Sequence, residues 1–345
     1  MELDVFKPTL LIRISLVCVI SAAMNVPPDR SSSRLCIMSS MWYISLLRGD
    51  VPRFLSPKRT CLSSGKAKGY NADVLKYDRI GYWSEVKLDI IRKYAQAYST
   101  IMTKQGRFSH IYIDGFAGTG EHISKNTGEF IPGSPLNALA VRPPFSEYHL
   151  VDLDSAKAEN LRSLTAGQSN VHIYDGDCNK VLRKDIFPRT RYEDYRRALC
   201  ILDPYGLHLD WEVMYDAGQM KSIEIFLNFP IMDMNMNVLK RNPENADGSQ
   251  VARMNSFWGD TSWRDAAYST EGLLFGEEKT DNEAVADAFR DRLRKVAGFA
   301  YVPAPMPMRN SKGAIVYYLF FASPNTTGAK IVTDIFSTYR DRRDL

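Results

Sequence analysis

Between residues 82 and 340 the sequence alternates between short runs rich in β-branched and aromatic residues and longer runs with helical spacing. The first helix is predicted over 82–102, where apolar residues recur every three or four positions and Ser84 is placed to cap the start. Strands separated by helices must lie parallel, because the chain crosses a face of the sheet between them. This alternation therefore predicts a doubly wound α/β sheet.

The predicted elements follow in a regular order. Five strands are expected at residues 110–116, 147–154, 171–177, 198–206 and 223–229, with helices at 135–141, 155–164, 178–187 and 210–218. After them we expect a helix at 281–297, two strands at 299–305 and 314–322 joined as a hairpin-like pair, and a last helix at 326–340. The predicted fold is thus a parallel sheet with a C-terminal antiparallel pair, formed by residues 76–345.

Charge is unevenly distributed along the 345 residues, whose net charge is +4. Residues 1–70 carry ten basic and four acidic residues, which leaves 34 basic and 36 acidic residues in the remainder. The domain is therefore slightly acidic, and the basic balance is not evidence for a nucleic-acid partner. With 45% hydrophobic and 24% charged residues, the composition excludes a chain disordered throughout.

The first 75 residues read as a basic leader, rich in Ser, Pro, Arg and Lys and without amphipathic periodicity, which is typical of disorder. An organelle transit peptide, a start codon assigned too far upstream and a basic tail for nucleic acid remain alternatives. Residues 10–24 are mostly apolar, but the stretch is short and interrupted by Arg13, so no membrane span is expected. A signal peptide is disfavoured because the start of the chain lacks a positive charge excess.

The cysteines form no C-x-x-C pair and no spacing with histidine that would build a zinc site. They are Cys18, Cys36, Cys61, Cys178 and Cys200. An odd, scattered set is typical of free thiols in a reducing compartment, so we expect a cytoplasmic protein with no bound metal. The five histidines are equally dispersed, and we interpret them as structural or exposed residues.

A glycine-rich turn follows the first predicted strand, at the carboxyl edge where ligands bind in open parallel sheets. It runs from Asp114 through Gly115, Phe116 and Gly118 to Gly120. Its G-x-x-G-x-G spacing differs from the G-x-G-x-x-G of dinucleotide enzymes, and it lacks the Lys-Ser/Thr pair of a P-loop. A nicotinamide enzyme is therefore disfavoured, and the motif resembles the first motif of nucleic-acid base methyltransferases.

Acidic residues end the next two strands. Asp152 is placed to accept hydrogen bonds from a ribose diol, and Asp177 to accept one from the exocyclic amino group of adenine. Asp154 competes with Asp152 for the first role, although we favour it as a helix cap. Three acids after three successive strands, counted with Asp114, are harder to attribute to capping than any one of them alone.

The most specific motif is Asp203-Pro204-Tyr205-Gly206, after the fourth predicted strand. Enzymes that methylate an exocyclic nitrogen carry D-P-P-Y or a close variant here, because the Asp side chain and a proline carbonyl hold the amine while the aromatic ring stacks on the base. The present form lacks the second proline and is closer to the D-P-F-G of tRNA guanine dimethyltransferases. A tight turn is the alternative reading of the isolated tetrapeptide.

Taken together, the layout is similar to that of class I S-adenosylmethionine (SAM)-dependent methyltransferases, and about three quarters of the chain resembles the three-Cys-motif partner (TcmP) family. The matching motifs are Trp83-x-x-x-Lys87, Tyr112 to Gly120, Gly133-Ser134-Pro135, Asp203 to Gly206, Asn228-Phe229, Met254, Phe257-Trp258-Gly259, Trp263 and Tyr317 to Ser323. The resemblance implies a methyltransferase-like fold and a partner protein with a radical-SAM-like three-cysteine motif. This chain has no C-x-x-x-C-x-x-C motif of its own.

Residues 230–270 interrupt the alternation and are rich in Met, Asn, Arg and Trp. We expect an insertion that forms either a lid or partner surface, or a segment that packs through its Met and Trp side chains.

The sequence thus predicts a SAM-dependent N-methyltransferase acting on an exocyclic amine of a nucleobase in DNA or RNA. Its expected catalytic residues are Asp203, Pro204 and Tyr205, and its cofactor-binding residues Asp114, Gly115, Phe116, Gly118, Gly120, Asp152 and Asp177. The alternatives are a non-catalytic partner or regulatory subunit of a radical-SAM-like three-cysteine protein, and a methyltransferase of small molecules.

Overall fold

Seven strands form the central sheet of the computed structural model, which describes residues 77–269 and 278–340. They are β2 (Ser109–Asp114), β5 (Glu147–Asp152), β6 (Val171–Asp175), β7 (Arg196–Leu202), β8 (Ile223–Phe229), β11 (Met306–Arg309) and β12 (Ile315–Ala322). Their order is β11-β12-β8-β7-β2-β5-β6. Neighbours from β6 to β8 run parallel, whereas β12 is antiparallel to both β8 and β11. The predicted doubly wound α/β fold with a C-terminal antiparallel pair is confirmed.

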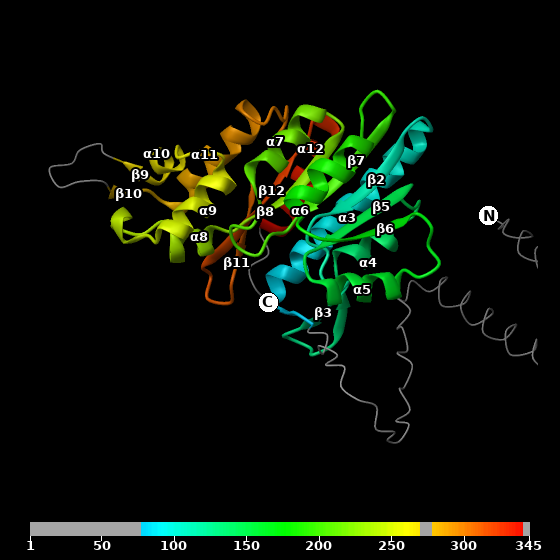
Figure 1. Cartoon of the computed structure of the whole chain (residues 1–345), viewed down its shortest axis with the longest axis horizontal. Helices are drawn as coiled ribbons and strands as arrows, with labels where there is room; N and C mark the ends of the chain where they lie inside the picture. The colour runs from blue at the N-terminus through cyan, green and yellow to red at the C-terminus, as the bar shows by residue number, and fades with distance from the viewer. Residues whose placement is uncertain (1–76, 270–277, 341–345) are drawn as a thin grey trace, which may run out of the picture. The chain divides into compact units, whose positions relative to one another are not determined.

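Helices cover both faces of this sheet (Figure 1). They include α3 (Tyr82–Gln105), α4 (Ser134–Leu139), α5 (Ser155–Leu164), α6 (Cys178–Val181), α7 (Trp211–Met220), α11 (Asn282–Lys295) and α12 (Thr326–Arg340). Alternate side chains of a strand enter two different cores. In β12, Leu319 and Phe321 join the cluster formed with α3 and α12, while Phe320 joins the cluster formed with α7 and α11.

Two expectations about local structure were wrong, and a third, a helix over 178–187, is confirmed with a change of helix type. Helix α3 begins after Gly81, which offers no side chain, so Ser84 does not cap it. Residues 299–305 form no strand beyond an isolated bridge at Tyr301, and the edge strand is instead β11. Pro303 and Pro305 have no N–H to donate to a ladder, but β11 accommodates Pro307 at the sheet edge, so proline content alone does not set where pairing begins. The helix predicted over 178–187 continues past α6 only as a π turn over Leu182–Ile186 and a short 3₁₀ turn.

The predicted insertion is an ordered group of short elements that lies at one end of the molecule, away from α4 and α5 (Figure 1). It comprises α8 (Ile231–Asn237), a 3₁₀ turn (Pro243–Asn245), α9 (Gly248–Trp258), α10 (Trp263–Ala267) and strand β9 (Tyr268–Ser269), which pairs with β10 (Glu278–Lys279). Met254, Phe257, Trp258 and Trp263 are buried in the same core as α7 and α11. Packing through Met and Trp is therefore one of its roles.

A small second sheet, which the sequence did not predict, joins β1 (Arg79–Ile80), β3 (Glu121–Ser124) and β4 (Phe130–Pro132). It continues from the glycine-rich turn and brings Asp78 and His122 close to the carboxyl edge of the main sheet.

The leader predicted for residues 1–75 lies outside the described residues. Among the helices that the structure does describe, none is both long and apolar enough to cross a bilayer.

Candidate functional site

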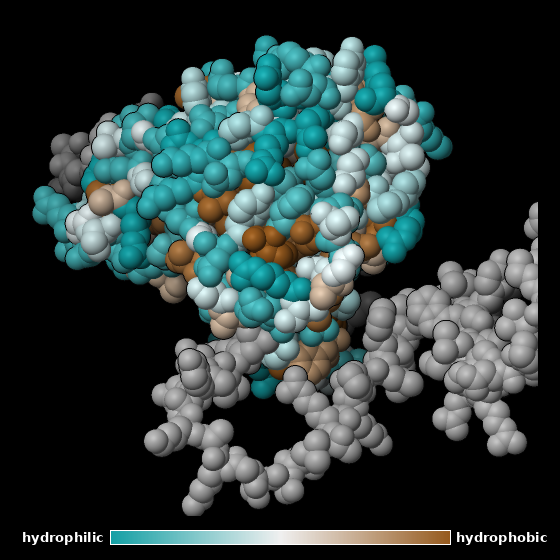
Figure 2. All heavy atoms as spheres, turned by 45° about the vertical axis from the view of Figure 1, so that its right-hand side comes forward, coloured by the Kyte–Doolittle hydropathy of each residue, from teal (hydrophilic) through white to brown (hydrophobic). Residues whose placement is uncertain are grey.

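A cavity of about 730 Å³ opens at the carboxyl ends of β2, β5, β6 and β7. Its volume is in the usual range for a small-molecule site. Five of the ten residues predicted for the site line it, namely Gly115, Phe116, Asp152, Asp177 and Tyr205. Leu153, another lining residue, is 75% exposed. Figure 2 shows that one face of the described domain is mostly hydrophilic, with hydrophobic residues in its middle.

Asp152 ends β5 with its carboxylate fixed by backbone groups. One oxygen accepts the N–H of Gly118 at 2.8 Å, and the other accepts the N–H of Asp154 at 2.9 Å. A carboxylate oxygen has a second lone pair, so both can still accept a hydrogen bond from a ligand. The glycine-rich turn thus orients the Asp152 carboxylate at the cavity wall and leaves each oxygen able to accept a further hydrogen bond.

The other two acids at the strand ends are helix caps. Asp154 caps α5 by accepting the N–H groups of Ala156 and Lys157, as predicted. Asp177 caps α6 by accepting the N–H of Asn179 at 3.0 Å. Both also line the cavity, so capping and ligand binding are compatible for Asp177.

The glycine-rich turn contributes less of the wall than predicted. Asp114 is completely buried and is not a lining residue, and Gly118 and Gly120 do not line the cavity either. Burial raises the pKa of Asp114 to about 6, against the opposing hydrogen bond from the Phe116 N–H. Asp114 therefore supports the turn from beneath, while Gly115 and Phe116 face the cavity.

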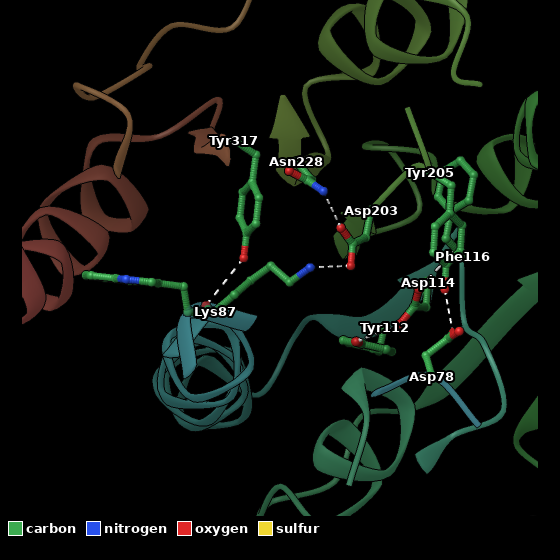
Figure 3. Close-up of polar contacts among 10 residues, drawn as sticks. Asp78, Lys87, Tyr112, Asp114, Phe116, Asp203, Tyr205, Asn228 and Tyr317 are labelled. Carbon is green, nitrogen blue, oxygen red and sulfur yellow. Dashed lines mark hydrogen bonds and ion pairs between the residues drawn. The ribbon is translucent and has the colours of Figure 1, made fainter. Parts of the chain in front are cut away.

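Asp203 follows β7 and is held by two side chains from other elements (Figure 3). Asn228, near the end of β8, donates to Oδ1 at 2.7 Å, and the ammonium of Lys87, on α3, forms an ion pair with Oδ2. About a third of the Asp203 side chain stays exposed, against 10% for Lys87. Both carboxylate oxygens are therefore held, while part of the side chain stays exposed to solvent and each oxygen keeps a second lone pair.

Lys87 is a buried cation in a polar cluster. Burial lowers its pKa, but the Asp203 carboxylate together with Tyr317 and Asp114 outweighs burial and raises the pKa, so Lys87 stays protonated at neutral pH. Its Nζ also lies 5.2 Å from the centre of the Tyr317 ring. Burial lowers the pKa of nearby His122, and the positive charge of Lys87 adds to that effect.

Tyr205 is 61% exposed, and its hydroxyl donates to Asp78 at 2.6 Å. Lys157 lies 5.5 Å from the centre of the ring and 3.7 Å from Asp78. These contacts fix an aromatic ring at the cavity edge. Pro204, between Asp203 and Tyr205, is buried.

The turn ends at Gly206, where two constraints require glycine. Its φ is +64°, and an added Cβ would lie 2.9 Å from an Asp233 carboxylate oxygen on α8. The insertion therefore packs directly against the predicted catalytic turn.

Helix α9 supplies the wall opposite the strand ends. Its exposed residues Ala252, Arg253 and Ser256 line the cavity, while the opposite side of the helix is buried in the core. Ser256 also donates to Asp210 at 2.6 Å. The insertion is thus both a packed segment and part of the cavity wall, and the two sequence interpretations are not exclusive.

Sequence reasoning assigned no role to Lys87, Asn228 or Asp78. Lys87 did carry a signal, because it interrupts an apolar helical stripe that contains Trp83, Ile90 and Tyr94. A lysine at such a position is rarely buried unless it is paired. Asp78 carried none, since its contact with Tyr205 spans 127 positions of the chain.

The chain was compared with known proteins. No protein-family model matches it, and no curated protein is significantly similar to it. Similar crystal structures include a Legionella pneumophila protein (TM-score 0.45, 12% identity, covering 76% of this chain and 94% of that chain). A SAM-dependent methyltransferase from Clostridium acetobutylicum is also similar, with a TM-score of 0.34, 12% identity, and 68% of this chain and 92% of that chain covered. For one from Leishmania major the TM-score is 0.33, the identity 10%, and the covered shares 68% of this chain and 72% of that chain. These values are too low to carry an argument about function, so the fold rests on the strand order itself.

Proposed function

We propose that the chain is a SAM-dependent N-methyltransferase acting on an exocyclic amine of a nucleobase in DNA or RNA. The observation that carries this proposal is the pairing of two features at one sheet edge. A cavity lined by Asp152 and Asp177 adjoins a turn in which Asp203 is fixed but partly exposed, and Tyr205 presents an exposed ring.

The residues present fit the cofactor. Asp152 would accept hydrogen bonds from the ribose diol with its free lone pairs, and Asp177 would accept one from the adenine amine. Phe116 and Leu153 offer apolar contacts in the same cavity. Bound SAM supplies an electrophilic methyl group on a sulfonium centre.

The acceptor would be held by the catalytic turn. The partly exposed Asp203 carboxylate can accept an N–H of the amine, and the exposed Tyr205 ring can stack on a base. Catalysis by such a site comes mainly from positioning the nitrogen in line with the methyl group.

The deciding experiment is mass spectrometry of nucleosides from a strain that carries the gene and from its deletion strain. We expect one methylated base to disappear on deletion and to return with the wild-type gene, but not with Asp203→Ala. Identical nucleoside profiles, together with no calorimetric binding of SAM by the purified chain, would contradict the proposal.

A second candidate is a non-catalytic partner of a radical-SAM-like three-cysteine protein, in line with the TcmP resemblance. The observation that favours it is the small negative charge of the chain beyond residue 70, with 34 basic and 36 acidic residues, which is a weak electrostatic footprint for a polyanion. Co-purification with the neighbouring gene product, without any change in nucleosides on deletion, would favour this candidate.

A further inference from the structure

Lys87 forms an ion pair with Asp203, the carboxylate that the proposed function assigns to binding the methyl acceptor. Lys87 comes from α3, which precedes the whole βα alternation, and it meets a residue 116 positions later. It lines no part of the cavity with Asp152 and Asp177, and so is separate from the proposed cofactor contacts.

Stability alone does not explain why a buried lysine is paired with a carboxylate here. Removing two charges from water costs about as much as their attraction returns, so a buried ion pair is a weak stabiliser compared with apolar residues of similar size. Here the pair fixes one carboxylate oxygen, and Asn228 fixes the other at 2.7 Å. Together they hold the Asp203 side chain in one orientation, while about a third of it stays exposed.

We propose that Lys87 is a positioning and specificity-determining residue: it orients Asp203 and cancels its charge, so that the acceptor position takes an uncharged, weakly basic amine. This inference rests on the proposed function and deepens it.

The local charges support this role. The groups around the pair are Asp114 on β2, His122 on β3 and Tyr317 on β12. Burial lowers the pKa of His122, which favours its neutral form. Burial raises the pKa of Asp114 only to about 6, so this carboxylate is ionised at neutral pH, but it is completely buried and does not line the cavity. Lys87 pairs directly with the partly exposed Asp203, so the formal charges of these two side chains cancel at the proposed acceptor position.

The cancelled charge of the Asp203 carboxylate determines which amines the acceptor position attracts. An isolated carboxylate attracts alkylammonium groups, such as that of lysine, which are protonated at neutral pH and have no lone pair to attack a methyl group. A carboxylate whose charge is cancelled loses that attraction but can still accept an N–H bond. An amine conjugated to a nucleobase ring is uncharged at neutral pH and fits this position.

The first test needs no activity. Unfolding by denaturant is measured for Lys87→Met, Asp203→Asn and the double variant. We expect the double variant to be more stable than Lys87→Met, because Lys87→Met leaves the half-buried Asp203 carboxylate without its cation, whereas the double variant has no charge there to stabilise. If the losses of unfolding free energy in the two single variants simply add up in the double variant, the two side chains do not interact, and the proposal is contradicted.

The second test measures methyl transfer from SAM to nucleic acid extracted from the deletion strain, with poly-lysine as the alkylamine probe. We expect Lys87→Met to lower kcat about a hundredfold, with calorimetric SAM affinity unchanged, and Lys87→Arg to recover most of the loss. We expect no transfer to poly-lysine. Lys93→Met is the matched control, because Lys93 lies on the same helix and pairs with Asp89 away from the turn.

Wild-type turnover by Lys87→Met, a loss confined to SAM affinity, or a failure of Lys87→Arg to recover activity would overturn the role of Lys87. Methyl transfer to poly-lysine would contradict the claim that the acceptor position selects uncharged amines. If the wild-type chain modifies no nucleic acid, the proposed function fails, and the unfolding cycle still decides whether Lys87 holds Asp203.

Discussion

Asp152 and Asp154 lie two residues apart and allow ligand binding to be separated from helix capping. Asp152→Ala should weaken SAM binding about tenfold or more, because it removes a charged acceptor from the cavity wall. Asp154→Ala should weaken SAM binding less than Asp152→Ala, because Asp154 lines the cavity but its Oδ1 caps α5, and it should cost about 1 kcal/mol of stability through the lost cap. Calorimetry and urea unfolding of both variants measure the difference. Equal losses of SAM affinity would show that Asp152 has no special role.

Gly328, in α12, allows an unusually close approach between elements. An added Cβ would lie 2.5 Å from the Tyr94 hydroxyl and 2.7 Å from Oε1 of Glu224. Glu224 is buried and accepts hydrogen bonds from Tyr94, Ser323 and Asn325, so neither neighbour can move freely. Gly328→Ala should therefore destabilise the fold by roughly 1–3 kcal/mol.

Urea unfolding measures this loss. Gly248→Ala is the control, because a Cβ there meets nothing within 4 Å at the start of α9. If both variants are equally stable, the close packing of α12 on α3 and β8 is not a constraint.

Helix α9 is the element through which the insertion affects the cavity. Ala252→Trp should fill part of the cavity and weaken SAM binding about tenfold or more, with little change in stability because Ala252 is exposed. Ala284→Trp makes the same change at an exposed position of α11 that does not line the cavity. Calorimetry on the two variants distinguishes a cavity wall from a distant surface, and equal affinities would exclude α9 from the site.

The elements themselves were largely predictable. Residues 155–164, 223–229 and 326–340 are a helix, a strand and a helix with the predicted ends, because periodicity and caps are local signals. At 299–305 the prediction failed, because only Tyr301 forms a bridge there and the pairing with β12 begins at Met306. The small sheet of β1, β3 and β4 was missed because strands of two to four residues carry too little pattern.

Two buried groups, Asp114 and His149, change the free energy of unfolding in opposite directions as pH falls. Burial raises the pKa of Asp114 to about 6, so folding takes up a proton there and this contribution to stability grows as pH falls through 6. Burial, with the neighbouring His172, lowers the pKa of His149 to about 4, so its contribution falls as pH drops from its ordinary value of about 6.5.

Asp114→Asn should separate these effects. Above pH 6 the variant lacks a buried ionised carboxylate that costs on the order of 3 kcal/mol, so it should gain stability relative to wild type. The gain should shrink as pH falls from 7 to 4.5, where Asp114 is protonated. Denaturant unfolding at both pH values measures it, and a difference that does not change with pH would contradict the assignment.

The sequence by itself determined the order of strands and helices, the doubly wound fold and the positions of acids after strands, because each follows from periodicity and from the meeting of parallel strand ends at one edge. It placed Asp152, Asp177 and Tyr205 at that edge correctly. Only the tertiary structure decided that Asp114 is buried, that α9 lines the cavity, and that Lys87 pairs with Asp203. Those three facts depend on which side chains meet across more than thirty residues of chain, and no local pattern records burial or a partner at that separation.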